Sequence, residues 1–286
     1  KIREMIHRAN TEKLKKLFED FRPDVVVCTQ AYPCGMVADY KKTFRLDLPL
    51  VGILTDYAPH SYWIYDNVNK YIVPSRETGE KLSRNGILEE NIKPFGIPID
   101  PKFTAALDKD PIRREFDLDP EIPTILIMGG GQGLGPIKKI LLAMDRIGQR
   151  HQTLAVTGTN KKLRGWIRGR RFKKKVVAFG YIDFIERLME ISNLIVTKPG
   201  GVTTAEALAK QLPILIINPL PGQEAMNTKF LLNEGVALKA DSENNLADLI
   251  DWLLSNPAKL KQISQRIPMY ARPDAAFKAA ELILSL

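Results

Sequence analysis

The chain has 286 residues, of which 44% are hydrophobic and 26% are charged, and its net charge is +9. This composition is typical of a folded, water-soluble protein and excludes a disordered, collagen-like or disulfide-stapled chain. The sequence has two cysteines, no apolar run of the roughly 20 residues needed to span a bilayer, and no signal peptide. These features favour a reduced cytosolic protein. We predict no metal site.

In the first half, short apolar runs alternate with amphipathic segments, a rhythm typical of a parallel sheet covered by helices. A helix is predicted over about residues 2 to 20, and further helices after Cys34 and after Ser75. The predicted strands are Asp24–Thr29, Leu50–Thr55 and Lys70–Val73. The proline-rich segment from Pro94 to Pro123 excludes a continuous helix or central strand and is predicted to be a linker, so we place an N-terminal domain at residues 1–105.

The second half contains more strands. They are predicted at Thr124–Met128, Thr153–Thr157, Val176–Phe179, Leu194–Thr197 and Ile214–Asn218, each followed by a helical pattern. We assign residues 106–270 to a second domain and residues 271–286 to a C-terminal helix that could pack back on the first domain. The predicted fold class is α/β, with two Rossmann-like doubly wound domains and a cleft between them. The N-terminal domain, with fewer strands, is predicted to lack its opening βα units.

A run of basic residues accounts for much of the positive charge. Between residues 161 and 175 no acidic residue occurs, and the basic ones are Lys161, Lys162, Arg164, Arg168, Arg170, Arg171, Lys173, Lys174 and Lys175. Such a run is suited to phosphate, an anionic membrane or nucleic acid, and a solvated helix face is the alternative.

The first candidate site is the glycine-rich loop after the strand that ends at Met128. Its first residues are Gly129, Gly130 and Gly131, and a helix is predicted from about Pro136. Glycine lets a backbone approach a ligand closely, and the helix N-terminus supplies N–H groups for an anion. The loop lacks the Gly-Lys-Ser/Thr of a Walker loop and the later acidic residue of a dinucleotide fingerprint, so a tight connection without ligand is the alternative.

The second candidate site follows the strand Leu194–Thr197. Its members are Lys198, Gly200, Gly201, Val202, Thr203 and Glu206, with the hydroxyl of Thr204 nearby. Two glycines opening a helix form a suitable cradle for a diphosphate, and a carboxylate one turn later can accept two hydrogen bonds from a ribose diol. A third polar set, Gln223, Glu224 and Asn227, begins the helix after the next strand and is suited to the hydroxyls of a sugar.

Together these segments resemble the donor-binding half of GT-B glycosyltransferases. The sequences KPGGVTTAEAL and PGQEAMN are similar to those of glycosyltransferase family 28, which contains the plant monogalactosyldiacylglycerol synthases and the bacterial processive diacylglycerol glucosyltransferases. The resemblance continues upstream in TDYAPHSYW and FGIPIDPKF, so it covers nearly the whole chain. It implies an inverting transfer of a hexose from a UDP-sugar to a membrane lipid such as diacylglycerol, by a peripheral protein at the cytoplasmic face of a membrane, without a metal or other cofactor.

The resemblance also implies roles for individual residues. The loop from Gly129 to Gly131 and the Gly200–Gly201 turn would hold the diphosphate, Glu206 the ribose, and Gln223 with Glu224 the hexose. The segment containing Phe179, Tyr181 and Ile182 would bind uracil through its backbone.

The acceptor side is less defined. Members of this family begin with a glycine-rich turn that contains a histidine, and this turn is absent from the sequence given, so we expect the natural protein to extend upstream by on the order of 80–120 residues, two or three βα units. Asp56 and His60 follow the strand Leu50–Thr55 and are the candidate catalytic residues. Tyr57, Tyr62 and Trp63 are candidates for an acceptor groove or for lipid contact, with core packing as the alternative.

Three other functions stay open from the sequence. A UDP-N-acetylglucosamine 2-epimerase has the same architecture, and the enzyme that adds N-acetylglucosamine to peptidoglycan lipid I is a more distant relative. A basic nucleic-acid-binding protein is a remote alternative, because no reader motif is present, and we predict no nucleic-acid partner.

Overall fold

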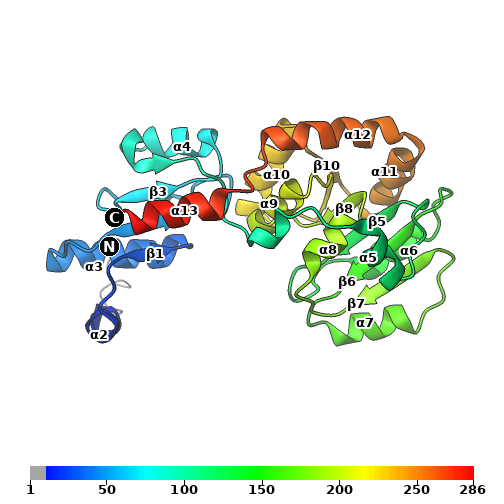
Figure 1. Ribbon diagram of the computed structural model, residues 1–286, viewed down its shortest axis with the longest axis horizontal. Coiled ribbons are helices and arrows are strands. Elements are labelled where there is room, and N and C mark those ends of the chain that lie inside the picture. Colours follow the sequence, from blue (N-terminus) through cyan, green and yellow to red (C-terminus); the bar gives the residue numbers. More distant parts are fainter. Residues whose placement is uncertain (1–10) are drawn as a thin grey trace. The chain divides into compact units, whose positions relative to one another are not determined.

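The computed structural model describes residues 11–286, which form two compact units (Figure 1). The first unit runs to Ile99 and also contains Arg272–Leu286, and the second comprises Asp100–Ala271. The helix predicted over residues 2 to 20 is observed as α2 (Thr11–Phe21), and its earlier part lies outside the described residues.

Four parallel strands form the sheet of the first unit within its described residues. They are β1 (Val26–Cys28), β2 (Leu50–Ile53), β3 (Lys70–Ile72) and β4 (Ile92–Lys93), in that spatial order. The side chains of β2 alternate between two cores, because successive residues of a strand point to opposite faces. Leu50 packs on the side of α3 (Ala31–Phe44), whereas Val51 and Ile53 pack with Ala279 of the C-terminal helix α13 (Ala275–Leu284).

The helix predicted after Ser75 is α4 (Arg76–Ser83). The Ser75 hydroxyl accepts a hydrogen bond from the Thr78 N–H at 3.2 Å, the usual N-cap arrangement. The strand β4 was not predicted, since it is two residues long and lies directly before Pro94, where the segment interpreted as linker begins. That segment contains short helices, η3 (Pro101–Phe103) and α5 (Lys109–Glu115).

The described second unit is built on six parallel strands in the order β10-β9-β8-β5-β6-β7. Their bounds are β5 (Thr124–Met128), β6 (Gln152–Val156), β7 (Lys175–Phe179), β8 (Leu194–Thr197), β9 (Ile214–Ile217) and β10 (Ala237–Ala240). The first five agree with prediction to within one residue at each end. The sixth, β10, was missed because its sequence ALKA at the sheet edge has little of the β-branched or aromatic character of a strand.

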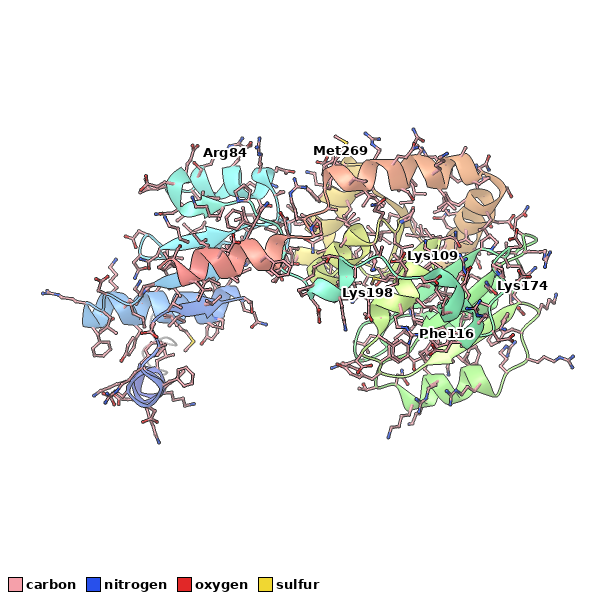
Figure 2. All side chains as sticks on the ribbon, viewed as in Figure 1. Arg84, Lys109, Phe116, Lys174, Lys198 and Met269 are labelled. Atoms are coloured by element: carbon pink, nitrogen blue, oxygen red, sulfur yellow. The ribbon has the colours of Figure 1, made fainter. Side chains whose placement is uncertain are left out.

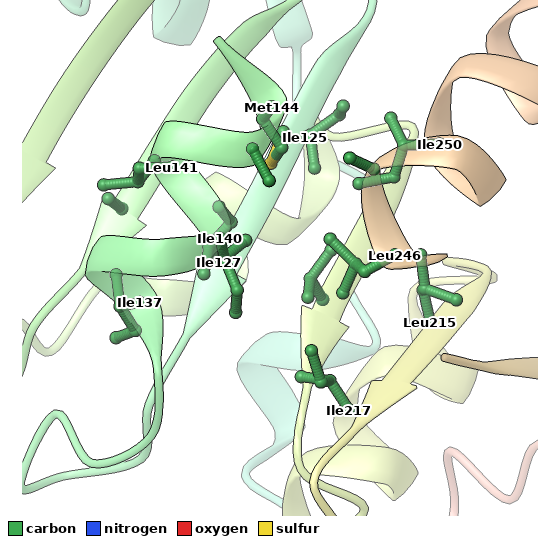
Figure 3. Packing of buried hydrophobic residues seen from close by; sticks show 14 of the residues in the cluster. Ile125, Ile127, Ile137, Ile140, Leu141, Met144, Leu215, Ile217, Leu246 and Ile250 are labelled. Atoms are coloured by element: carbon green, nitrogen blue, oxygen red, sulfur yellow. The ribbon is translucent and has the colours of Figure 1, made fainter. Parts of the chain in front are cut away.

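The helices of this unit follow the strands in a regular alternation. They are α6 (Ile137–Met144), α7 (Lys161–Arg168), α8 (Ile185–Glu190), α9 (Gly201–Ala209), α10 (Gln223–Asn233), α11 (Glu243–Ser255) and α12 (Pro257–Arg266). On one face of the sheet, α6 and α11 pack over the strands through Ile140, Leu246 and Ile250, which contact Ile127 and Leu215 within a single apolar cluster (Figure 3). Burial of each such side chain stabilises the fold by roughly 1.5–3 kcal/mol.

The strand order defines where a ligand can bind in this unit. The chain starts at the central strand β5, proceeds outward to β6 and β7, and then returns to the other side of β5 with β8. In doubly wound sheets, the loops that leave the two strands at such a reversal separate and open a crevice at their carboxyl ends. The reversal between β5 and β8 therefore marks the expected binding edge.

Candidate functional site

The glycine-rich loop and the KPGG turn leave the two strands that flank this reversal. The loop follows β5 and the turn follows β8, and these strands pair in register, with Ile127 opposite Val196. The segments that the sequence singled out therefore meet at one edge of the second sheet.

The glycine-rich loop packs backbone against backbone on the loop after β6. The Thr159 N–H donates to the Gly131 carbonyl at 2.9 Å, and a Cβ added at Gly133 would lie 2.0 Å from the Thr157 carbonyl oxygen. Gly133 also has φ = +59°, in the left-handed region. Gly131 is different, because no described atom lies within 4 Å of a Cβ added there. Gly133 is required for packing, whereas Gly131 leaves open space beside its backbone.

The KPGG turn leads directly into α9. Gly200 is the N-cap residue, its conformation is extended, and a Cβ added to it would meet no other atom of the described chain within 4 Å. In the first turn, the N–H groups of Gly201, Val202 and Thr203 have no hydrogen-bond partner among the described residues, as expected for the start of a helix. These donors and the positive end of the helix dipole favour an anion at this turn.

Two predicted ligand groups are used inside the protein instead. Thr204 is buried, and its hydroxyl donates to the carbonyls of Gly200 at 3.0 Å and Gly201 at 2.8 Å. Asn227 has no exposed surface, and its Nδ2 donates to the Pro199 carbonyl at 3.0 Å. The expectation that Asn227 contacts a sugar is therefore wrong, because its amide holds the turn that precedes α9.

Lys198 and Glu224 form an ion pair across the site. The Lys198 Nζ lies 3.2 Å from Glu224 Oε1, and Glu224 Oε2 accepts a hydrogen bond from the Leu220 N–H at 2.7 Å. The pair joins the turn after β8 to the first turn of α10 and fixes the orientation of the Glu224 carboxylate. Gln223 is the first residue of the same helix and is exposed beside it.

Glu206 lies in the second turn of α9 in an environment that favours its neutral form. The pKa of its carboxyl is raised to about 7, chiefly by burial; Lys102 opposes this rise, and the nearby carboxylates Asp100 and Glu186 contribute to it. At neutral pH this carboxyl is thus close to the midpoint of its titration, which makes its charge sensitive to a ligand.

Lys102 is a member of this site that sequence reasoning missed. Its Nζ donates to the Asp183 carbonyl at 2.5 Å and lies 3.4 Å from Glu186 Oε2. It therefore joins the loop after β7 to the surroundings of Glu206. The only signal in the sequence was its place in the segment FGIPIDPKF, which carried no expectation for the lysine itself.

The loop after β7 is the segment predicted to bind a base. The Phe179 carbonyl accepts hydrogen bonds from the Thr157 N–H at 3.0 Å and from the Thr157 hydroxyl at 2.9 Å, so it is already used within the protein. Its ring packs edge-on against Phe116, with 5.1 Å between ring centroids. The prediction is therefore corrected for Phe179, which has a structural role. Tyr181 is 74% exposed, and the backbone N–H and C=O of Ile182 have no hydrogen-bond partner within the described chain.

The acceptor-side candidates lie after β2 in the first unit. His60 is exposed, and its Nδ1 accepts a hydrogen bond from the Tyr62 N–H at 3.2 Å, where it caps the short helix η1 (Ser61–Trp63). Asp56 lies four residues earlier and is partly buried. Tyr62 is exposed, whereas Tyr57 and Trp63 are buried. The expectation of surface roles for Tyr57 and Trp63 is wrong, and Trp63 belongs to the core of this unit.

The described residues contain neither a metal-binding cluster nor a helix that could span a membrane. Residues 11–286 include no cluster of three or more histidine, cysteine or acidic side chains arranged to hold a metal ion. Among the described helices, none is both long and apolar enough to cross a bilayer.

Comparison with known sequences follows the division into units. The profile of the Monogalactosyldiacylglycerol (MGDG) synthase family matches residues 1–99, and that of Glycosyl transferases group 1 matches residues 108–268. A processive diacylglycerol beta-glucosyltransferase of Bacillus licheniformis is 29% identical over 262 residues, which cover 91% of this chain and 68% of the relative. A probable monogalactosyldiacylglycerol synthase 3 of Oryza sativa is 33% identical over 280 residues, which cover 93% of this chain and 55% of the relative.

Solved structures with the same fold have low sequence identity. The MurG protein of Acinetobacter baumannii superposes with a TM-score of 0.68 at 15% identity, covering 96% of this chain and 77% of MurG. A UDP-GlcNAc 2-epimerase of Neisseria meningitidis gives a TM-score of 0.73 at 14% identity, covering 99% and 82%. These likenesses agree with the predicted GT-B fold of two Rossmann-like units. The chain therefore belongs to the GT-B glycosyltransferase family that contains the monogalactosyldiacylglycerol synthases and the processive diacylglycerol glucosyltransferases.

Proposed function

We propose that this protein transfers a hexose from a UDP-sugar to diacylglycerol or a related membrane lipid, with inversion at the anomeric carbon. The observation that carries the proposal is the pairing of β5 with β8, which brings the open backbone of Gly131 and the free N–H groups at the start of α9 to one sheet edge. The names of the sequence relatives, which are diacylglycerol glycosyltransferases, supply the acceptor class.

The second unit is proposed to bind the donor. The diphosphate would lie against Gly131 and the first turn of α9, where backbone N–H groups and the helix dipole stabilise the charge that develops on the departing UDP. This stabilisation needs no metal ion. Glu206 would accept hydrogen bonds from the ribose hydroxyls, and Ile182 would pair with the uracil edge through its unoccupied backbone groups. Gln223 and the carboxylate of Glu224, held in place by Lys198, would bind the hexose.

The first unit is proposed to bind the acceptor. Transfer with inversion requires a base that removes the proton from the attacking hydroxyl oxygen as that oxygen approaches the anomeric carbon. Asp56 and His60 are the candidates. In the neutral His60 ring Nδ1 is the nitrogen without a proton, because it accepts the hydrogen bond from the Tyr62 N–H, so His60 can take a proton only once that bond opens. The lipid acceptor implies a protein that binds peripherally at an anionic membrane surface, and we propose no nucleic-acid partner.

The solved structures of MurG and of the UDP-GlcNAc 2-epimerase are 15% and 14% identical to this chain, so their likeness supports the fold alone. The bacterial and the plant relative are both named as diacylglycerol glycosyltransferases. These names favour transfer to diacylglycerol over epimerisation.

An assay with two products tests the proposal. The chain is incubated with UDP-glucose or UDP-galactose and with vesicles that contain diacylglycerol, and glycolipid and UDP are both quantified. Stoichiometric appearance of glycolipid and UDP with one of the donors is expected. UDP-N-acetylglucosamine converted to its 2-epimer, with no glycolipid from any donor, would contradict the proposal and favour the epimerase.

A further inference from the structure

The second unit carries a concentrated patch of exposed cations on α7 and on the loop that leads to β7. We define the basic face as Lys161, Lys162, Arg168, Arg170, Arg171 and Lys173, all of which are exposed. The helix and its outward-directed side chains lie at the lower edge of the second unit, and Lys174 marks the loop beyond it (Figure 2). None of these six residues belongs to the proposed UDP-sugar site.

The basic face is a purely polar surface, because the apolar side of α7 is used elsewhere. Leu163 and Ile167 are buried in the main core of the unit. Asn160 caps the helix by accepting a hydrogen bond from the Leu163 N–H at 2.9 Å, which fixes how the helix is rotated on the sheet. A partner can therefore contact only the charged side of α7, and that side has no apolar residue that could insert into the partner.

The charges of the basic face are not compensated within the protein. Across the described chain, none of its six cations lies within 4 Å of a carboxylate, although several other cations of the unit do, such as Lys239 with Asp241 and Arg187 with Glu115. The nearby Asp145 carboxylate already accepts hydrogen bonds from the backbone N–H groups of Lys173 and Lys174. The mutual repulsion of these cations is relieved when an anionic partner approaches.

The hollow next to this loop extends the positive region. It has a volume of about 550 Å³ and is lined by Arg150, Lys173, Lys174 and Lys175 together with Asp117 and Asp119. Two of its cations are paired, Lys175 with Asp117 and Arg150 with Asp119. The side chains of Lys173 and Lys174 can therefore bind an anionic group.

The aromatic residues near the basic face argue against a nucleic-acid partner. Single-stranded nucleic acids are bound by cations interleaved with exposed aromatic rings on which bases stack. Trp166 and Phe172 are partly buried in the core, and the Arg170 guanidinium lies 5.5 Å and 5.8 Å from their ring centroids. Lys138 covers Trp166 as well, at 5.3 Å. These rings are therefore covered by cations and are not stacking platforms.

We propose that the basic face docks the second unit onto a bilayer surface that carries anionic phospholipids. This proposal rests on the proposed function, which places the acceptor in a membrane. Lysine and arginine residues near such a surface each gain attraction from its negative potential, which decays within about 10 Å at moderate ionic strength. Binding should accordingly depend on the fraction of anionic lipid, decrease with salt, and involve no insertion of side chains into the acyl region.

Vesicle sedimentation of the whole chain tests the docking surface. Vesicles of phosphatidylcholine with phosphatidylglycerol are compared with vesicles of phosphatidylcholine alone. The variant is Arg171→Glu/Lys173→Glu, and the matched control is Lys259→Glu/Lys261→Glu on α12, at the opposite end of the unit, which changes the net charge equally (Figure 1). We expect the parent and the control to sediment with the anionic vesicles only, and the variant to bind them at least about tenfold more weakly.

Other results would overturn the proposal. An equal loss of vesicle binding in both double variants would mean that net charge alone drives binding. Unchanged vesicle binding by the Arg171→Glu/Lys173→Glu variant would place the membrane contact elsewhere. Binding to arbitrary duplex DNA that is tighter than binding to the anionic vesicles, and is lost in the same variant, would assign the face to nucleic acid. Calorimetry with UDP separates these results from a failure of the proposed function, because all three proteins should bind UDP equally.

Discussion

Glu206 and Lys102 show how a site can depend on the environment of single residues. The carboxyl of Glu206 is partly buried in the second turn of α9, and burial raises its pKa to about 7 from the ordinary value of 4.5. Lys102, which lies 104 positions earlier in the chain, opposes this rise. The charge of the proposed ribose ligand is therefore set by residues from distant segments.

We expect the affinity for UDP to increase as the pH rises through about 7. The ionised carboxylate of Glu206 accepts hydrogen bonds from ribose hydroxyls better than the neutral acid does, and one unit below its pKa only about a tenth of the groups are ionised. Calorimetric titrations with UDP over this pH range check the expectation. Inorganic pyrophosphate, which has no ribose, is the control, and an identical pH profile for both ligands would remove Glu206 from the ribose site.

The Glu206→Gln variant should be more stable than the parent protein above neutral pH. Because the folded-state pKa is raised, the folded protein binds this proton more tightly than the unfolded chain does, so the parent loses stability as the pH rises from 4.5 to about 7. Glutamine avoids the cost of a partly buried charge, and the expected gain in unfolding free energy at pH 8 is on the order of 1–2 kcal/mol. Denaturant unfolding at pH 8 and at pH 4.5 measures it, and a gain of the same size at both values would point to another cause.

Replacing Lys102 with glutamine should weaken UDP binding at neutral pH. The lysine lowers the pKa of Glu206, so its removal shifts the pH profile for UDP upward and reduces the affinity at pH 7 by roughly two- to tenfold, with recovery at higher pH. Lys109→Gln is the matched control, because Lys109 pairs with Glu190 instead. A loss of affinity that stays the same at every pH would mean that Lys102 acts only by holding the Asp183 carbonyl.

At the scale of elements, the glycines divide into those that the fold needs and those that a ligand would need. Gly133 is fixed by its positive φ and by its contact with the Thr157 carbonyl, whereas Gly131 and Gly200 adopt conformations open to other residues and face open space. The sequence presents all of them as one kind of residue. Only the packing of the loop after β6 distinguishes them.

We therefore expect Gly131→Ala and Gly200→Ala to retain the fold and to bind UDP at least about tenfold more weakly. The added methyl groups meet no protein atom within the described residues, but they would occupy space that the diphosphate needs. The cost to stability should be at most about 1 kcal/mol, the loss of a glycine N-cap. Thermal unfolding and UDP calorimetry on the same samples check both parts. Full UDP affinity in both variants would place the diphosphate elsewhere.

Gly133→Ala is the contrasting substitution in the same loop. Its methyl group would overlap the Thr157 carbonyl oxygen, and its φ of +59° disfavours alanine, so we expect a loss of stability of roughly 2–4 kcal/mol. The midpoint of denaturant unfolding measures the loss. A variant as stable as Gly131→Ala would show that this loop can rearrange.

At the scale of the whole molecule, the second unit contains every segment assigned to the donor. We expect residues 100–271, expressed alone, to fold and to bind UDP within a few-fold of the affinity of the full chain, because their six-stranded sheet and its core are complete within that range. Circular dichroism confirms folding before calorimetry is done. A folded fragment without UDP affinity would show that the first unit supplies part of the donor site.

The sequence by itself determined the α/β architecture, the central strands to within two residues and the positions of the glycine turns. These features depend on a few neighbouring residues, such as the apolar run Thr124–Met128 or the N-cap Ser75. The edge strands β4 and β10 were not predicted from the sequence, because short strands take their conformation from a neighbouring strand in the sheet.

Only the tertiary structure decided what each polar or aromatic side chain does. Asn227 holds the Pro199 carbonyl from 28 positions away, Lys102 contacts Asp183 across 81 positions, and Trp63 is enclosed by a core that the sequence does not delimit. Burial and partners depend on which distant segments the sheet brings together. For that reason the chemistry of Glu206, with a pKa that burial raises to about 7, is a property of the fold and not of the motif in which it lies.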